Sequence, residues 1–593
     1  MTPINDLKLM ANKLRVASLD STTAAGSGHP TSCLSCAEII SALFFSVMGP
    51  EDEFILSKGH AAPILWAAYA EAGFIDAAEL RNLRKIGSML EGHPTARMPL
   101  VKIATGSLGQ GLSAGVGLAL AQRLKGSSGR IYVLLGDGEC AEGAVWEAAG
   151  SASYYGLSSL CAIVDANRLG QAGPTMHQHD LEPYARKFDA FGWDAQVVDG
   201  HAMEDLLAAF KHAVQCQKPC AIIAKTFKGK GVSFLENKGG WHGKPLNAAQ
   251  LQEALAEIGA ATVTLPSRIK TVPVSYAAAG FEPNTYRKEE MVSTREAFGR
   301  ALVKLGRNDR TVVALDADVM NSTMTEHFFE EFPERSFQTF IAEQNMAGMA
   351  VGLSARGYKP FVATFASFLT RAHDFIRMAQ YSRSNIKFAG SHAGISIGPD
   401  GPSQMGLEDI PMFLSMPEAM VLYPSDAVSA ERLVEVMARH TGISYLRLTR
   451  DKTPVIYDRV ETFPPGGLKV LRQDDRDLVL VVAAGITVHE ALKAHEMARE
   501  RGILTRIIDL YSIKPLGRDA LAGHAQACHG NVVVVEDHYC GAIGDLVSAA
   551  VGKTHSLSVR EIPRSGRRED LLGQYGIDAS AIVGAAEQIV HVC

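Results

Sequence analysis

Short apolar runs bounded by turn residues recur along the chain and alternate with segments of helical pattern. In the first part of the chain, VLLGDG, LCAIVD and PCAIIAKT are almost uniformly apolar, while EGAVWEAAGSASYYG has the periodicity of a helix. Uniformly apolar strands separated by helices are typical of a parallel sheet covered on both faces. This pattern predicts an α/β domain built from βαβ units.

The same alternation returns twice, each time after a stretch without periodicity. Residues 258–290 and 451–464 gain prolines and lose the apolar pattern, so we interpret both as linkers. TVVALDAD, FVATFASF and IKFAGSH follow the first linker, and DLVLVVAAG, LTRIIDL and NVVVVEDH follow the second. We therefore expect three doubly wound α/β domains with mainly parallel sheets, at 1–257, 291–450 and 465–593.

Composition narrows the class of protein. With 47% hydrophobic and 21% charged residues and a formal net charge of −6, the chain has the profile of a globular protein and argues against nucleic acid or a membrane as the main partner. No apolar run approaches the ~18 residues of a membrane span, and MTPINDLKLMANKLRVAS lacks the apolar core of a signal peptide. The nine cysteines are scattered, and the Cys33–Cys36 pair has no second pair to complete a zinc site. We expect reduced thiols and a cytoplasmic location.

Two of the predicted strands end in polar groups, which buried strands do not need. Asp137 follows IYVLLG between two glycines, and Asn167 follows LCAIVDA. Because ligands bind at the carboxyl ends of parallel strands, these side chains would supply hard oxygen ligands for Mg²⁺ or Ca²⁺ beside a phosphate group. Gly136 and Gly138 allow a sharp turn there. A dinucleotide site is disfavoured because no G-x-G-x-x-G follows a strand at this point.

The separation of Asp137 and Asn167 resembles the diphosphate–metal motif of thiamine-diphosphate enzymes. Further motifs resemble the transketolase family, in the same order and over essentially the whole chain: GSGHPTS (26–32), LSKGHAAP (56–63), EGHP (91–94), TGSLGQGL (105–112), TFKGKG (226–231), WHGKP (241–245), IAEQNM (341–346), SIGPDGPSQM (396–405) and EDH (536–538). The resemblance implies the thiamine-diphosphate-binding fold with a C-terminal α/β domain. It also implies a homodimer with active sites at the subunit interface.

The same resemblance implies the reaction and its cofactors. The expected activity is reversible transfer of a two-carbon ketol unit from a ketose phosphate to an aldose phosphate, through a dihydroxyethyl-thiamine diphosphate intermediate, as in the pentose phosphate pathway. The expected cofactors are thiamine diphosphate and Mg²⁺ (or Ca²⁺). The cofactor would supply the chemistry that stabilises a carbanion, and the protein would supply binding, orientation and proton transfer.

Site residues can be assigned from the matching motifs. The Asp137 and Asn167 side chains and the Leu169 carbonyl would bind the metal ion, and Glu343 would bond the aminopyrimidine N1′ and favour the imino tautomer that removes the thiazolium proton. The residues that the resemblance places near thiamine diphosphate are Ser32, Lys58, His60, Gly106, Ser107, Leu108, Gly138, Glu142, Asn167, Gln171, Lys228, His242, Phe365, Phe368 and Gln404.

Four histidines, each beside glycine or proline, are expected to form a cationic, hydrogen-bonding funnel above the thiazolium ring. They are His29, His60, His93 and His242. An ordinary histidine pKa lies close to working pH, which suits removal and return of a hydroxyl proton. We assign those proton transfers to His242 and His29, which would also contact substrate, and count His93 among the catalytic residues.

The far end of the substrate is expected to meet a phosphate pocket drawn from several segments. Arginine is suited to it because its planar fork can hold a phosphate by two hydrogen bonds. The expected residues are Arg295, Ser322, His392 and Arg450, with Asp400 accepting a hydrogen bond from an aldose hydroxyl. The Ser403-Gln404-Met405 sequence and Lys58 resemble the animal-type branch of the family, in which Gln404 would contact the aminopyrimidine.

Other functions remain open from the sequence. A sibling ketol transferase, such as a dihydroxyacetone synthase or a transketolase acting on sulfo-sugars, would need the same machinery with a different anion or acceptor. A deoxyxylulose-phosphate synthase is disfavoured by His392 and by the context of Arg295 and Arg450. A non-catalytic homologue is disfavoured because every proposed catalytic position holds the required residue type.

Overall fold

The structure is a computed structural model that describes residues 2–270, 274–276 and 280–592. The chain divides into two compact units. Unit 1 comprises Met1–Val274, Ala347–Arg356 and Asp374–Arg383, and unit 2 comprises Ser275–Met346, Gly357–His373 and Ser384–Cys593. The predicted linker at 258–290 begins with the last residue of α9 (Ala248–Ile258) and contains no other helix or strand residue among those described. The predicted linker at 451–464 is not wholly irregular, because it contains the short strand β13 (Lys452–Pro454).

Unit 1 is built on one five-stranded sheet in which neighbouring strands are all parallel. Its order is β1-β2-β3-β5-β4, with β1 at Glu53–Leu56, β2 at Ile131–Gly136, β3 at Leu160–Ala166, β4 at Asp194–Asp199 and β5 at Cys220–Lys225. The register pairs Gly136 with Asp165, so the Gly-Asp-Gly turn lies beside the segment that carries Asn167. The expected convergence of these two strand ends is therefore present.

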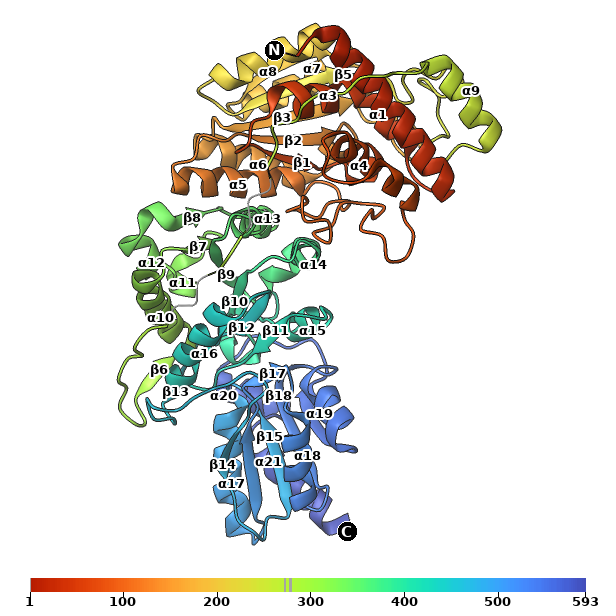
Figure 1. Ribbon diagram of the computed structural model, residues 1–593. Coiled ribbons are helices and arrows are strands. Elements are labelled where there is room, and N and C mark those ends of the chain that lie inside the picture. Colours follow the sequence, from red (N-terminus) through yellow and green to blue (C-terminus); the bar gives the residue numbers. More distant parts are fainter. Residues whose placement is uncertain (1, 271–273, 277–279, 593) are drawn as a thin grey trace. The chain divides into compact units, whose positions relative to one another are not determined.

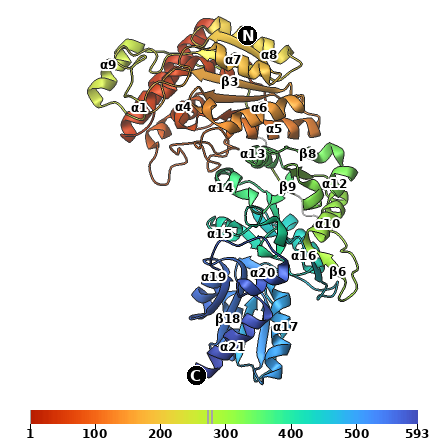
Figure 2. The same ribbon diagram turned by 180° about the vertical axis from the view of Figure 1, so that it is seen from behind.

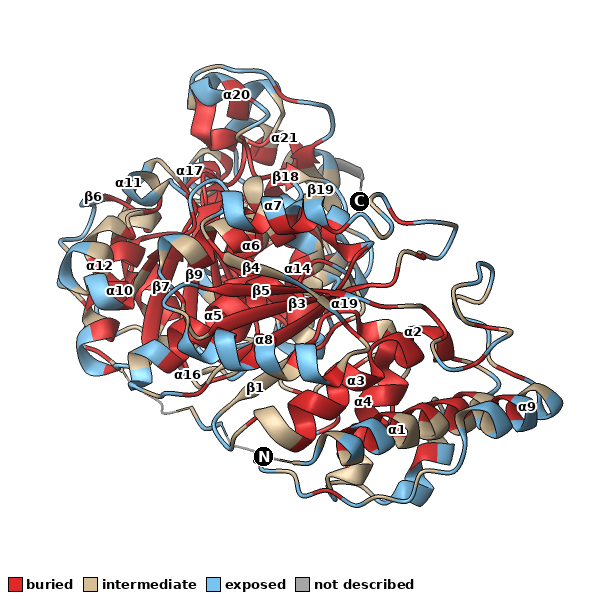
Figure 3. Cartoon of the chain, turned by 90° about the horizontal axis from the view of Figure 1, so that it is seen from above, coloured by how far each residue is buried: buried red, intermediate tan, exposed pale blue. Residues whose placement is uncertain are grey.

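Helices cover both faces of this sheet (Figures 1 and 2). One face packs against α1, α3, α4 and α8, and the other against α5, α6 and α7. Figure 3 shows β3 and most of β5 buried, β4 partly exposed, and the outward turns of α7 and α8 exposed. The helices of unit 1 are α1 Ile4–Ala25, α2 Pro30–Ser35, α3 Ala37–Ala42, α4 Ala62–Glu71, α5 Gly111–Lys125, α6 Gly143–Tyr154, α7 Glu182–Ala190, α8 Met203–Gln215 and α9 Ala248–Ile258; α13 (Glu343–Ser354) and α14 (His373–Tyr381) contribute most of their length.

Two glycines let α5 and α13 approach at backbone distance within unit 1. A Cβ at Gly117 would lie 2.0 Å from the Met349 carbonyl oxygen, and a Cβ at Gly352 would lie 2.0 Å from that of Ala114. Any larger residue at either glycine would separate the helices.

Unit 2 contains two larger sheets and one strand pair. The seven-stranded sheet has the order β17-β11-β12-β10-β9-β7-β8, and only its edge strand β17 is antiparallel. Its strands are β7 Val312–Asp316, β8 Ser336–Gln338, β9 Lys359–Phe365, β10 Lys387–Ser391, β11 Met420–Leu422, β12 Ser444–Arg447 and β17 Ser512–Lys514. The short strands β6 (Met291–Ser293) and β13 (Lys452–Pro454) form the antiparallel pair.

The other large sheet of unit 2 has the order β14-β16-β15-β18-β19, with β14 antiparallel at its edge. Its strands are β14 Lys469–Arg472, β15 Val479–Ala483, β16 Thr505–Asp509, β18 Val532–Tyr539 and β19 His555–Val559. The helices of unit 2 are α10 Thr294–Asn308, α11 Met320–Thr323, α12 Glu326–Glu331, α15 Asp409–Leu414, α16 Ala427–Arg439, α17 Thr487–Glu500, α18 Arg518–Ala527, α19 Ile543–Val551, α20 Arg568–Gln574 and α21 Ala579–Val592. The expected α/β class with three mainly parallel sheets is confirmed.

A buried arginine joins the two sheets of unit 2. The Arg447 guanidinium, from the end of β12, bonds Asp409 at 2.8 Å and Asp537 of β18 at 2.6 Å, and all three side chains are fully buried. Within the described part of the chain, no helix combines the length and the apolar character needed to cross a bilayer.

Candidate active site

A cavity of about 350 Å³ lies at the carboxyl ends of β2 and β3 in unit 1. Parallel sheets bind their ligands at this edge, which is the reason the strand ends carry polar groups. The lining includes Gly136, Glu139 and Gly170, together with these residues singled out from the sequence: His29, Lys58, His60, His93, Gly106, Leu108, Asp137, Gly138, Asn167, Leu169, Gln171, Lys228 and His242.

Asp137 and Asn167 stand at neighbouring strand ends and are each only 5% exposed. The Asp137 carboxylate accepts hydrogen bonds from the backbone N–H groups of Gly138 (2.9 Å) and Arg168 (2.8 Å) and from the Thr175 hydroxyl (2.8 Å). Burial raises the pKa of Asp137, since no described side chain forms an ion pair with it. A buried carboxylate beside an amide oxygen is a donor set suited to a divalent cation.

A buried ion pair lies directly behind this edge. Lys58 bonds the Asp165 carboxylate, and the two side chains are 1% and 0% exposed. Asp165 also accepts hydrogen bonds from Ser35 at 2.7 Å and from the Asn167 amide at 3.1 Å. Burial alone would raise the pKa of Asp165, but the Lys58 charge and the hydrogen bonds from Lys58, Thr226 and Ser35 hold it below its usual value. The Asp165 carboxylate of this pair orients the Asn167 amide. It also neutralises the Lys58 ammonium group, whose charge is therefore balanced within the protein.

Lys228 places a cation at the expected metal-binding edge. Its Nζ donates to the Leu169 carbonyl at 2.7 Å and to Nδ1 of His242 at 2.7 Å. Burial, followed by repulsion from Lys58, lowers the pKa of Lys228 to about 8. An ammonium group at the Leu169 carbonyl is an observation of this structure that fits a cation site there.

The four histidines form one cluster around the cavity. Ring centroids lie 4.9 Å apart for His29 and His242, 5.3 Å for His29 and His60, and 6.1 Å for His29 and His93. Burial, reinforced by neighbouring cations, lowers the pKa of His29 to about 4 and that of His242 to about 3. The pKa values of His60 and His93 are lowered by the same cause. These shifts favour neutral rings near pH 7 and so argue against the expected cationic character of the funnel, whereas its hydrogen-bonding role stays a prediction.

Two further observations fit a bound anionic cofactor. Within the described residues, the buried Nδ1 of His29, which lines the cavity, has no hydrogen-bond partner. Gly106 has φ +128°, and a Cβ there would lie 2.8 Å from Cδ2 of His93. Position 106 therefore favours glycine, and it lines the same cavity as the unpartnered nitrogen of His29. The two features together are typical of a site where a ligand approaches the backbone closely.

Three residues of unit 1 that were expected near the cofactor do not line the cavity. The Ser32 side chain is fully buried, and its carbonyl accepts a hydrogen bond from Lys58 at 3.0 Å. The Ser107 hydroxyl bonds the carboxylate of Asp374, which belongs to α14 in unit 1. Glu142 is exposed.

One functional-site acid was missed from the sequence. Glu139 is buried, and its carboxylate accepts hydrogen bonds from the N–H groups of Gly109 (2.8 Å) and Gly136 (2.9 Å). It thereby fixes the glycine turn that precedes Asp137. Its position two residues after Asp137 was the available signal.

In unit 2, the residues expected around the aminopyrimidine lie on adjacent segments. Glu343 begins α13 and is 5% exposed, with the Arg371 guanidinium 3.7 Å from its carboxylate. Phe365 ends β9 and stacks on Phe368, with ring centroids 5.1 Å apart and an interplanar angle of 4°. The Gln404 carbonyl accepts a hydrogen bond at 3.2 Å from Ser367, the residue before Phe368.

The residues of the expected phosphate pocket also gather in unit 2. Arg295 donates to the Ser322 carbonyl at 2.7 Å, and Arg450 donates to Asp400 at 2.8 Å. His392 has φ +57° and stacks on Phe365 with centroids 3.8 Å apart. Burial, then the charges of the two arginines, lowers the pKa of His392 to about 3.

Within the described residues, Nε of Arg295 is buried without a hydrogen-bond partner. Two arginines that repel one another, one of them with an unpartnered donor, make a site that favours an anion. The role of these residues in holding a phosphate group stays a prediction.

Comparisons with known proteins agree with these observations. Models of the transketolase thiamine diphosphate binding domain, the transketolase pyrimidine binding domain and the transketolase C-terminal domain match residues 7–298, 290–455 and 467–582. The chain is 47% identical to the transketolase of Homo sapiens and 47% identical to transketolase-like protein 2 of Mus musculus, in each case over 98% of this chain and 97% of the relative.

Solved structures share the fold. The transketolase of Campylobacter jejuni aligns with a TM-score of 0.87 at 24% identity, covering 98% of this chain and 99% of that one. A Pichia stipitis transketolase described in complex with sedoheptulose 7-phosphate aligns with a TM-score of 0.87 at 21% identity, covering 100% and 98%. The chain therefore belongs to the transketolase family of thiamine-diphosphate-dependent enzymes.

Proposed function

We propose that this enzyme reversibly transfers a two-carbon ketol unit from a ketose phosphate to an aldose phosphate. The observation that supports this most is the unit 1 cavity, where the oxygen donors of Asp137, Asn167 and Leu169 face the Lys228 cation and a cluster of neutral histidines. Relatives named transketolase support the reaction class.

The metal ion of the proposed site is Mg²⁺ or Ca²⁺, both of which prefer oxygen ligands. Asp137, Asn167 and the Leu169 carbonyl would bind it, and Lys228 would leave that carbonyl and meet the diphosphate as a counter-charge. Gly106, Leu108, Gly138 and Gln171 would line the rest of the cofactor site. Removing the metal with a chelator is expected to release thiamine diphosphate, and adding either ion is expected to restore binding, measured by equilibrium dialysis.

Bound thiamine diphosphate would supply the electron sink that takes up the carbanion left by cleavage of the C–C bond. The Glu343 carboxyl would hold a proton at N1′ of the aminopyrimidine, and Phe365 and Phe368 would pack against that ring with Gln404 at its edge. The burial of Glu343 supports this role because it shields the hydrogen bond from water.

Neutral histidines suit the proposed proton transfers. Because Lys228 donates to Nδ1 of His242, the neutral ring carries its proton on Nε2; return of that proton to a substrate oxygen would be balanced by transfer of a Lys228 proton to Nδ1, which leaves the ring neutral. His29, which has an unpartnered buried Nδ1 among the described residues, can accept the donor hydroxyl proton. His60 and His93 would complete the polar wall.

The far end of the sugar phosphate would bind at Arg295, Ser322, His392 and Arg450. Two guanidinium groups can hold a phosphate by charge-assisted hydrogen bonds. Asp400, which now bonds Arg450 at 2.8 Å, would exchange part of that contact for an aldose hydroxyl.

Glu343 provides the sharpest test. The Glu343→Gln enzyme, loaded with thiamine diphosphate and Mg²⁺, should release no shortened aldose from a ketose phosphate donor supplied alone, whereas the unaltered enzyme releases about one equivalent per site as the first half of a ping-pong reaction. Glu334→Gln is the matched control, because the Glu334 side chain is 64% exposed and lies outside the proposed site. Full release by Glu343→Gln would refute the assignment.

A substrate panel would distinguish transketolase from its sibling reactions by the acceptor and by the anion that the substrate carries. A panel of donors and acceptors with phosphate, sulfonate or no anion should show the highest kcat/KM for the phosphates. A clear preference for formaldehyde as acceptor would favour dihydroxyacetone synthase, and one for sulfo-sugars would favour that branch.

We also propose a homodimer whose active sites form at the subunit interface, and a cytoplasmic location. Sedimentation of the loaded enzyme should give twice the chain mass. The location is supported by thiols that all stand free among the described cysteines.

A further inference from the structure

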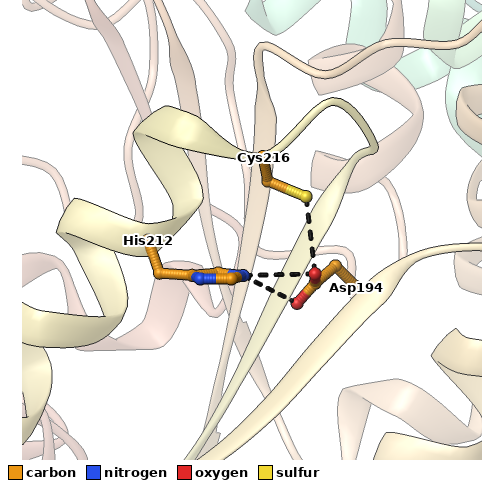
Figure 4. A group of neighbouring side chains, drawn as sticks. All are labelled: Asp194, His212 and Cys216. Atoms are coloured by element: carbon orange, nitrogen blue, oxygen red, sulfur yellow. Dashed lines mark hydrogen bonds and ion pairs between the residues drawn. The ribbon is translucent and has the colours of Figure 1, made fainter.

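Three side chains with different ligand atoms converge at the amino end of β4, away from the active-site cavity. Asp194 is the first residue of β4, His212 lies in the last turn of α8, and Cys216 directly follows that helix (Figure 4). The His212 Nε2 lies 3.2 and 3.1 Å from the two Asp194 carboxylate oxygens, and the Cys216 sulfur lies 3.5 Å from one of them. All three donor atoms lie within 4.8 Å of one another.

These separations match those of ligands around one tetrahedral zinc ion. With a Zn–S bond of about 2.3 Å and Zn–N and Zn–O bonds of about 2.0 Å, tetrahedral angles place sulfur and oxygen about 3.5 Å apart and nitrogen and oxygen about 3.3 Å apart. The observed sulfur–oxygen separation of 3.5 Å and nitrogen–oxygen separation of 3.1 Å are close to these values. The four-residue spacing of His212 and Cys216 places both on one side of the end of α8.

The charges at this site favour a dication. The Asp194 carboxylate and a Cys216 thiolate together cancel two positive charges, and the carboxyl end of a helix adds partial negative charge. The Arg130 guanidinium already donates to the Ala213 and Val214 carbonyls at this helix end. A dication with two anionic ligands is neutral overall, so it adds no net positive charge beside Arg130. A thiolate, an imidazole and a carboxylate together are a donor set that suits Zn²⁺ better than Mg²⁺ or Ca²⁺.

Solvent can reach the three donors. The side chains of His212 and Asp194 are 49% and 33% exposed, which leaves a path for the ion and a fourth position for water. Among the residues that the structure describes, this is the one group of three His, Cys, Asp or Glu side chains whose ligand atoms lie close enough together to share an ion.

We propose that Asp194, His212 and Cys216 form a zinc-binding site that is separate from the thiamine diphosphate site. Asp194 starts β4, whereas the cavity lies where β2 and β3 end, and parallel strands keep these two edges of the sheet apart. The site is structural or regulatory rather than catalytic, and no step of the proposed reaction depends on it.

Cobalt is the probe that distinguishes this site from the cofactor metal. The enzyme is first loaded with thiamine diphosphate and Mg²⁺ and is then titrated with Co²⁺. A thiolate ligand gives a sulfur-to-cobalt charge-transfer band in the near ultraviolet, whereas Co²⁺ at the oxygen ligands of the cofactor site gives none. We expect the band to saturate at one Co²⁺ per chain and to disappear when Zn²⁺ is added in excess.

Variants then assign the ligands. Cys216→Ser should lose the band, and His212→Gln should weaken Zn²⁺ binding at least about 10-fold in equilibrium dialysis. Cys540→Ser is the matched control, because Cys540 is an exposed free cysteine elsewhere in the chain. Thermal melts check that each variant is folded, and transfer activity should be unchanged in all three. Absence of the band from the unaltered enzyme, or its persistence in Cys216→Ser, would overturn the proposal whether or not the enzyme is active.

Discussion

Replacing Lys58 by methionine would measure how strongly the buried ion pair with Asp165 stabilises unit 1. The two side chains are 1% and 0% exposed, so Lys58→Met leaves a carboxylate in the interior without its counter-charge. Breaking a buried pair in this way costs about 3–5 kcal/mol. The lower part of that range is expected, because the hydrogen bonds from Ser35 and Asn167 to Asp165 remain.

The assay is thermal unfolding of the enzyme without cofactor, so that ligand binding does not contribute to the transition. At about 2 °C per kcal/mol for a unit of this size, the transition of unit 1 should fall by about 6–8 °C. Lys8→Met is the control: Lys8 and Glu204 pair at 2.9 Å with side chains 46% and 53% exposed, and such pairs contribute at most about 1 kcal/mol.

A double variant separates charge from packing. Lys58→Met combined with Asp165→Asn removes the uncompensated charge and should recover part of the lost stability. Equal transitions for Lys58→Met and Lys8→Met would refute the reasoning, and so would a double variant less stable than Lys58→Met.

Three further predictions concern the active site. Arg295→Gln should raise KM for a ketose phosphate by about 10–100-fold, the equivalent of one or two charge-assisted hydrogen bonds, with little change for the unphosphorylated ketose; equal losses in initial-rate assays would contradict the pocket. Gly106→Ala should weaken thiamine diphosphate binding at least about 10-fold in a fluorescence titration, because φ there is +128° and the added Cβ would meet His93 at 2.8 Å. Because burial and nearby cations lower the pKa of His29 to about 4 and of His242 to about 3, kcat/KM should have no acid limb centred at the ordinary histidine pKa of about 6.5. Below that pH these histidines bind protons in the unfolded chain but not in the native protein, so the free energy of unfolding should fall as the pH drops toward 4. Thermal melts between pH 7 and 4.5 would detect this fall.

The sequence predicted those features that depend on local pattern and strand direction. Uniformly apolar runs identified the strands, and the polar residues after two of them predicted that Asp137 and Asn167 would lie together. That inference succeeds because the carboxyl ends of parallel strands share one edge of a sheet. The matching motifs then supplied the remaining site residues, whose roles stay predictions.

Features that depend on three-dimensional surroundings could not be predicted in this way. Lys58 cannot be distinguished from other lysines in the sequence, and only the fold shows that it forms a buried ion pair with Asp165. The sequence shows the four histidines but not their burial. Their pKa values were therefore expected to be ordinary, whereas burial lowers them in the fold. The antiparallel pairing of edge strand β17 with β11 could not be predicted either, because an apolar pattern does not specify which strand is the partner. His212 and Cys216 had a helical spacing, but Asp194 lies on another element, so the group could be recognised only in space.

The uniform direction of the strands in unit 1 has a practical consequence. The cofactor cavity occupies one rim of the sheet, and the first residue of β4 belongs to the opposite rim. Attachment of the protein to a solid support, a dye or an electrode through the amino rim would place the anchor at the edge of the sheet opposite the cofactor cavity. The sheet thus offers a built-in orientation for immobilised enzyme without any change to residues that touch substrate.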